Sequence, residues 1–63
     1  MMDAFQVITK EIDEKVAQLS NFLTDGKAES YEHYKSMCGE IRGLLLSRGY
    51  TLDLKQRMES SDE

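Results

Sequence analysis

Apolar side chains in the first third of the chain recur every three or four positions, the period at which they share one face of an α-helix. The members of this pattern are Phe5, Ile8, Ile12, Val16, Leu19, Phe22 and Leu23. Asp3 and Gln6 have the spacing of a capping box, in which each side chain accepts a hydrogen bond from the other residue's backbone N–H. The pattern therefore predicts an amphipathic helix over about residues 3–23.

Turn-forming residues fill the next segment, about residues 24–30, where Gly26 can take the positive φ that ends a helix. Ser30 can cap a second helix. A second helical pattern continues to about residue 58, and its apolar members are Tyr31, Tyr34, Met37, Cys38, Ile41, Leu44, Leu45, Leu52 and Met58. We expect an all-α fold, a two-helix antiparallel hairpin with helices over about residues 3–23 and about residues 30–58.

Gly49 leaves two interpretations of the second helix open. One helix could end just before the glycine, and another could start with Thr51 as its N-cap. We favour a continuous helix, because Leu45 and Leu52 keep the helical phase across the glycine.

The apolar faces of the two helices would meet in a seam that holds the hairpin together. The residues expected in this seam are Phe5, Ile8, Ile12, Leu19, Phe22, Tyr34, Cys38, Ile41 and Leu45. Residues 1–60 would then form a single helical-hairpin domain, followed by a frayed acidic tail at residues 61–63.

More apolar surface remains than one seam can cover. Leu44, Leu45 and Leu46 span over half of the helix circumference, so a single partner helix cannot shield all three. Gly39 and Gly43 share one face, where another backbone could approach closely, or where both could be exposed and merely tolerated. The longer second helix also overhangs the first. We expect contacts with other chains at Gly39, Gly43, Leu46, Tyr50, Leu52, Leu54 and Met58.

The length of the chain supports the same expectation. A chain of 63 residues buries only about 60% of the surface that its unfolded form exposes, so its core is thin. Self-association would bury more apolar surface. We therefore expect a homo-oligomer, with a dimer that forms a four-helix bundle favoured over larger rings.

The charge and the cysteine content narrow the classes of partner. Twelve acidic and eight basic residues are interleaved and leave a net charge of −4, so we expect no direct binding to nucleic acid. The single cysteine cannot form an internal disulfide, which fits a reducing compartment. The sequence shows neither a long apolar run nor the pattern of a signal peptide. We expect a cytoplasmic protein with no membrane contact.

Candidate catalytic and metal-binding residues are few. His33 and Cys38 are five positions apart, so on a helix they point in different directions, and no further ligands stand at suitable spacing. We expect His33 to be solvated and Cys38 to pack as a small apolar residue. The acidic residues alternate with lysines, as on a solvated helix surface, and there is no glycine-rich phosphate loop. We therefore expect no metal, no cofactor, no catalytic residue and no enzymatic activity.

The second helix contains the segment YKSMCGEIRGL, followed eight positions later by LDL. The residues of interest in it are Tyr34, Cys38, Gly39, Ile41, Arg42, Gly43, Leu44, Leu52, Asp53 and Leu54. This half of the chain resembles a group of small proteins encoded by tailed bacteriophages, often near the head and portal genes. Gly49 departs from the group, in which a helix former is usual at that position. The resemblance implies a phage context and a role in virion assembly, and it implies no mechanism or catalytic residue.

Two functions are compatible with these observations. The first is a non-enzymatic phage accessory protein that acts through helical protein–protein contacts in virion assembly or structure. The alternative is a small host-takeover factor that binds and modulates a bacterial protein, for which small size and negative charge are equally natural. Both functions place the protein in the host bacterial cytoplasm, and the first also places it in the virion.

Overall fold

Helix α1 (Ala4–Thr24) begins at a capping box in the computed structural model, which describes residues 2–61. The Asp3 carboxylate accepts a hydrogen bond from the backbone N–H of Gln6 at 2.8 Å, and the Gln6 side chain accepts one from the N–H of Asp3 at 3.0 Å. These bonds satisfy two N–H groups at the start of the helix that have no partner within it. The predicted capping box is confirmed.

The loop between the helices, residues 25–30, uses the predicted stop and start signals. Gly26 has a φ of +71°, which only glycine adopts without a steric penalty at Cβ. Its N–H donates to the carbonyl of Leu23 at 3.0 Å and helps to close the end of α1. The hydroxyl of Ser30 accepts a hydrogen bond from the N–H of His33 at 3.0 Å, so Ser30 caps the second helix as predicted.

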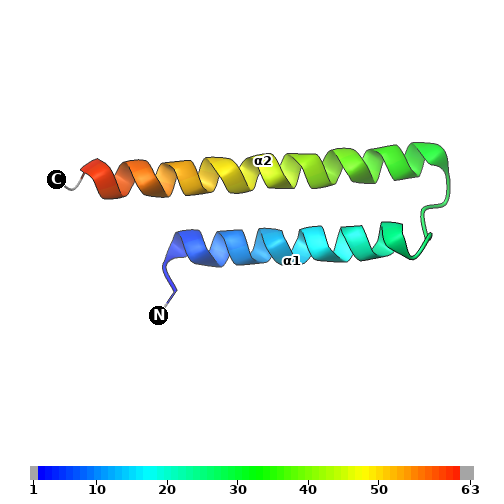
Figure 1. The fold of residues 1–63 in the computed structure, drawn as a ribbon, viewed down its shortest axis with the longest axis horizontal. Coiled ribbons are helices and arrows are strands. Elements are labelled where there is room, and N and C mark those ends of the chain that lie inside the picture. Colours follow the sequence, from blue (N-terminus) through cyan, green and yellow to red (C-terminus); the bar gives the residue numbers. More distant parts are fainter. Residues whose placement is uncertain (1, 62–63) are drawn as a thin grey trace.

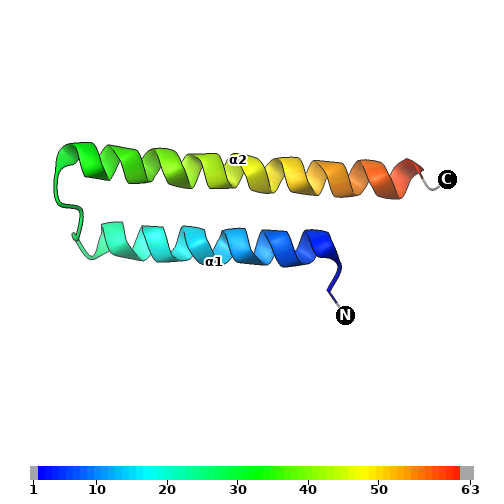
Figure 2. The ribbon, with the colours of Figure 1, turned by 180° about the vertical axis from the view of Figure 1, so that it is seen from behind.

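Helix α2 (Tyr31–Ser61) runs back along α1 in the opposite direction (Figure 1; Figure 2 shows the other side). It continues without a break through Gly49, which confirms the favoured interpretation. Beyond the glycine, Arg57 pairs with Asp53 one turn away at 2.6 Å. The helix ends three residues later than predicted, at Ser61, and the rest of the expected tail, residues 62–63, lies outside the described part of the chain.

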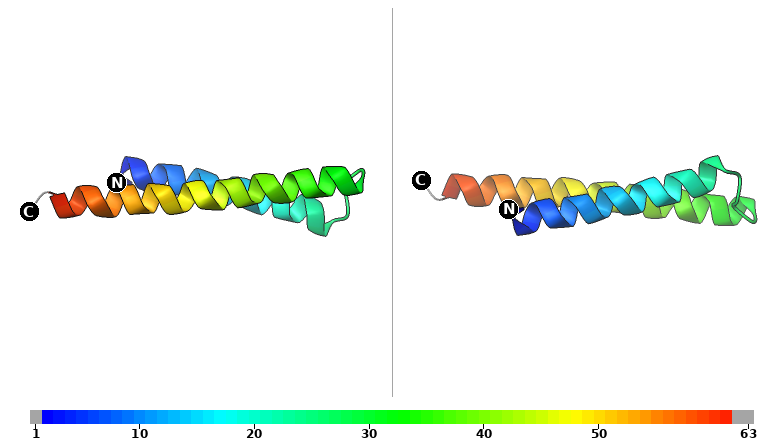
Figure 3. Two further views of the ribbon diagram at one scale, coloured as in Figure 1. Left: turned by 90° about the horizontal axis from the view of Figure 1, so that it is seen from above. Right: turned by 90° about the horizontal axis from the view of Figure 1, so that it is seen from below.

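The two helices cross at a shallow angle (Figure 3). Two contacts mark the ends of their shared length. Near the start of α1, the ammonium of Lys55 lies 3.3 Å from the carboxylate of Asp3. Near the loop, the rings of Phe22 and His33 meet edge to face with their centroids 5.9 Å apart. The end of α2 extends past the start of α1 (Figure 1). The structure is therefore the predicted all-α antiparallel hairpin.

The core of the hairpin is thin. Met37, at 7% exposure, is the one buried hydrophobic residue among residues 2–60. Half-buried residues of both helices surround it along the interface. From α1 these are Phe5, Thr9, Ile12, Val16, Leu19, Ser20, Phe22 and Leu23, and from α2 they are His33, Cys38, Ile41, Leu44, Arg48, Thr51 and Lys55.

The predicted seam is wrong for Ile8, Tyr34 and Leu45, which are 44%, 45% and 49% exposed. On α2, the face toward α1 is shifted by one position from the predicted one, so that His33 and Leu44 take the places expected for Tyr34 and Leu45. The other six predicted seam residues are half-buried.

Two ion pairs accompany this shift. Arg48 and Lys55 follow Leu44 at helical spacing on the face toward α1, where they pair with Asp13 at 2.8 Å and with Asp3 at 3.3 Å. A seam centred on Leu45 would turn both cations away from these carboxylates.

Among residues 2–61, neither helix has an apolar stretch of the length that a membrane crossing requires.

Candidate protein-interaction surface

Large apolar side chains lie on the outside of the hairpin. Within the described residues, eleven of them have between 41% and 72% of their surface exposed. They are Met2, Val7, Ile8, Tyr31, Tyr34, Leu45, Leu46, Tyr50, Leu52, Leu54 and Met58. Eight of the eleven belong to α2, so this helix carries most of the exposed apolar surface to which a partner could bind.

The exposed apolar residues of α2, together with the half-buried Cys38, fall into two groups by their helical spacing. One group, here called the α2 stripe, follows the edge of the seam at intervals of three, four and seven residues, and consists of Tyr31, Tyr34, Cys38, Leu45 and Leu52. The other group, here called the outer ridge, has a residue at every fourth position, and consists of Leu46, Tyr50, Leu54 and Met58.

The start of the α2 stripe carries stacked aromatic rings. The rings of Tyr31 and Tyr34 lie 6.4 Å apart, and the ammonium of Lys35 lies 5.6 Å from the centroid of the Tyr31 ring. A hydrogen bond with the Cys38 side chain is the largest cause that raises the pKa of Tyr34 above its ordinary value. Tyr34 and Cys38 also line a shallow depression of about 230 Å³ together with Lys35, Gly39 and Arg42.

The border of the stripe toward α1 is polar. Arg48 follows Leu45 by three positions and precedes Leu52 by four, so it is their neighbour on the helix surface. Its Nε donates to the Asp13 carboxylate at 2.8 Å. Both side chains are partly solvated, at 39% and 53% exposure, so the pair contributes little to stability but holds the two helices in register.

Gly39 and Gly43 lie next to the outer ridge, and no helix approaches them within the hairpin. A Cβ atom added at either position would meet nothing within 4 Å. Each glycine destabilises the helix by about 1 kcal/mol relative to alanine, and no contact inside the hairpin offsets that penalty. The open space leaves both positions accessible to another chain.

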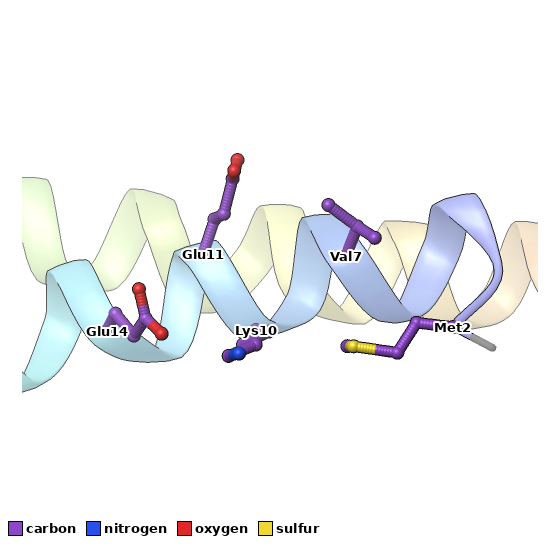
Figure 4. A pocket seen from close by; sticks show the side chains of 5 residues that line it. All are labelled: Met2, Val7, Lys10, Glu11 and Glu14. Atoms are coloured by element: carbon purple, nitrogen blue, oxygen red, sulfur yellow. The ribbon is translucent and has the colours of Figure 1, made fainter.

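A second shallow depression, of about 210 Å³, lies on α1 with α2 behind it (Figure 4). The side chains of Met2 and Val7 form its apolar part, and Lys10, Glu11 and Glu14 form its polar part. The sequence pattern does not reveal it, because three of the four residues that α1 contributes are charged and form no apolar stripe. The side chains project separately around open space, which is a weaker surface for a partner helix than the α2 stripe.

His33 has a structural role in place of the solvated one that was expected. Its ring is half-buried against Phe22, and its Nδ1 accepts a hydrogen bond from the backbone N–H of Glu29 at 3.1 Å. The residue thus fastens the loop to the first turn of α2. Cys38 is half-buried at the edge of the seam. Within residues 2–61, no set of histidine, cysteine and acidic residues is arranged to hold a metal ion.

The structure divides the predicted contact residues between the two surfaces. Leu46, Tyr50, Leu54 and Met58 form the outer ridge beside the two glycines, whereas Leu52 belongs to the α2 stripe. No protein-family model, curated protein or solved structure matches the chain significantly.

Proposed function

We propose that this protein is a non-enzymatic accessory protein of a tailed bacteriophage that self-associates and acts through helical contacts in virion assembly or structure. The phage context rests on the resemblance of residues 34–54. The contact-based role rests on the exposed apolar surface of α2. Such surfaces are unusual on small monomers and mark sites of protein–protein interaction.

The observation that carries the proposal is the excess of exposed surface. The chain exposes 5079 Å², whereas a compact monomer of its 7.3 kDa exposes about 4,200 Å². Its radius of gyration is 15.0 Å, against about 10.6 Å for a compact chain of 63 residues. Eleven large apolar side chains of the described residues share this exposed surface, so we infer that a partner covers part of it.

A role as a host-takeover factor is the second candidate. The outer ridge favours it, because Leu46 and Tyr50 are 54% and 70% exposed on a side of α2 that the α2 stripe does not use. A bacterial protein could bind there while copies of the chain associate through the stripe.

Sedimentation of two neighbouring leucine variants tests the self-association. Leu44 is half-buried in the seam and Leu45 is 49% exposed. Leu44→Asp places a charge between the helices, so we expect it to remove most helical circular dichroism. Leu45→Asp places the charge on the outside, so we expect it to keep the helical signal but to shift sedimentation from dimer to monomer.

A wild-type chain that sediments as a monomer at micromolar concentration would refute the self-association. Mass spectrometry of purified virions separates the two functions. A virion component is present at a fixed ratio to the other particle proteins. A host-takeover factor is absent from the particle and is recovered with one bacterial protein early in infection.

A further inference from the structure

We propose that the α2 stripe is covered by a second copy of this chain, with the two α2 helices packed antiparallel. The two-fold axis passes through the stripe at the level of residue 43 along the helix. This inference rests on the proposed function, because it specifies how the chain self-associates. In this dimer the stripe is the interface, and the outer ridge remains on the outside.

The excess accessible surface of the whole hairpin is comparable with one side of a standard interface. The chain exposes about 900 Å² more than a compact monomer of its mass, given its 5079 Å² of accessible surface. A stable interface of standard size buries about 800 Å² on each partner. The stripe offers the side chains for such an interface, since its tyrosines and leucines are between 41% and 72% exposed.

The composition of α1 decides which helix of the second copy meets the stripe. Gln6, Asp13 and Ser20 are spaced by seven residues and form one line along α1. The ion pair between Asp13 and Arg48 places this line beside the stripe. If α1 of the second copy covered the stripe, the leucines of the stripe would contact the polar line of that α1. Removing water from these polar side chains without giving them new partners costs free energy. If α2 covers the stripe, the leucines of the stripe can meet apolar side chains of the second copy.

Two apolar positions of the stripe find apolar partners in the antiparallel direction. Tyr34 and Leu52 each lie nine positions from residue 43, and Ile41 and Leu45 each lie two positions from it. A two-fold axis at residue 43 therefore places Tyr34 opposite Leu52 of the second copy, and Leu45 opposite its Ile41. Two antiparallel α2 helices also have opposed dipoles.

The parallel arrangement is disfavoured by charge. It would place each residue of the stripe and its border opposite the same residue of the second copy. Arg48 would then face Arg48, and Lys55 would face Lys55, which brings like charges together. In the antiparallel arrangement Arg48 instead lies opposite Cys38 of the second copy, so it stays free to pair with Asp13.

Disulfide trapping tests the arrangement. In a Cys38→Ser background, Tyr34→Cys and Leu52→Cys chains are prepared separately, mixed, equilibrated and mildly oxidised. We expect the mixture to give mostly disulfide-linked dimers that contain one chain of each kind, and either variant alone to remain unlinked. Leu46→Cys mixed with Tyr34→Cys is the matched control, because Leu46 lies on the outer ridge, and we expect it to give no link.

Three outcomes overturn the arrangement. Links within Tyr34→Cys alone and within Leu52→Cys alone indicate parallel helices. Efficient linking by the Leu46→Cys control places the interface on the outer ridge. If the chain sediments as a dimer but no disulfide forms, the interface lies elsewhere, and the proposed self-association still stands. A wild-type monomer in sedimentation refutes both proposals.

A second pair of variants guards against a local loss of structure. Circular dichroism first checks that each variant is helical. If Tyr34→Cys or Leu52→Cys unfolds, Tyr31→Cys and Gln56→Cys replace them, since both positions are exposed and lie almost equally far from residue 43. We expect this mixture also to link only between unlike chains, and its failure in a folded dimer overturns the arrangement.

Discussion

Gly26 and Gly43 are the same residue type in opposite conformational settings. Gly26 has a φ of +71° in the loop, where a Cβ atom would be strained whatever space surrounds it. Gly43 lies within α2, where an added Cβ would meet nothing within 4 Å. The first glycine is therefore required by the hairpin itself, whereas the hairpin would be more stable without the second.

Matched alanine substitutions measure this difference. We expect Gly26→Ala to lower the free energy of unfolding by about 1–2 kcal/mol, the penalty for a left-handed L-residue. We expect Gly43→Ala to raise it by about 1 kcal/mol, the difference in helix propensity. Urea unfolding followed by circular dichroism at one protein concentration gives both values. Equal losses in the two variants would mean that a neighbour in the folded state already occupies the space at Gly43.

At the scale of the helix, the carboxylate of Asp3 has two partners. It accepts the backbone N–H of Gln6 at 2.8 Å and lies 3.3 Å from the Lys55 ammonium. The hydrogen bond from Gln6, followed by the interaction with Lys55, lowers the pKa of Asp3 below its ordinary value. The charged form of Asp3 therefore stabilises the start of α1 and ties it to α2.

The sign of the pH effect follows from the lowered pKa. Asp3 contributes its stabilisation above its unfolded pKa of about 3.9 and loses it as the pH falls through the lower folded pKa. We expect the melting temperature to fall as acid is added below about pH 4. Asp3→Asn should flatten this decline, because asparagine still caps the helix but does not titrate there.

A second variant separates the two partners of Asp3. Lys55→Gln should flatten the decline less than Asp3→Asn does, because the Gln6 hydrogen bond is the larger cause of the lowered pKa. Thermal unfolding from pH 2 to 6 measures all three proteins. A wild-type curve as flat as that of Asp3→Asn would show that Asp3 is not held in the capping box in solution.

The elements of the hairpin were predictable from sequence because their signals are local. The capping box, the left-handed glycine and the serine cap each act within a few residues, and the structure shows each of them. The pattern of α1 was also clear, since its apolar residues fall mainly on one face. In contrast, the apolar residues of α2 are spread around the helix, so its pattern does not identify the face that α1 covers.

The choice between Leu44 and Leu45 shows why the binding surface was harder to predict. The two residues are adjacent, and each continues an apolar line along α2. The line that contains Leu44 is the one that brings Arg48 to Asp13, a contact over 35 positions that spacing along one helix does not reveal. The line that contains Leu45 was then left exposed as the α2 stripe.

At the scale of the molecule, the hairpin is 51 Å long and 11 Å across its shortest axis. This shape lets nearly every side chain reach water, and among residues 2–60 only Met37 is buried. Folding and association should therefore be coupled, because a partner supplies much of the apolar burial that the isolated hairpin lacks.

Coupling makes the melting temperature depend on protein concentration. For a dimer that unfolds to two chains, a hundredfold rise in concentration adds about 2.7 kcal/mol per dimer. With an unfolding entropy of about 0.26 kcal/mol/K for two such chains, the melting temperature should rise by about 10 °C. Leu45→Asp, which introduces a charge on the α2 stripe, should melt at a lower temperature that does not change with concentration. Leu46→Asp on the outer ridge should retain the concentration dependence of the wild type. If Leu46→Asp loses this dependence, the stabilising contact lies on the outer ridge and not on the α2 stripe.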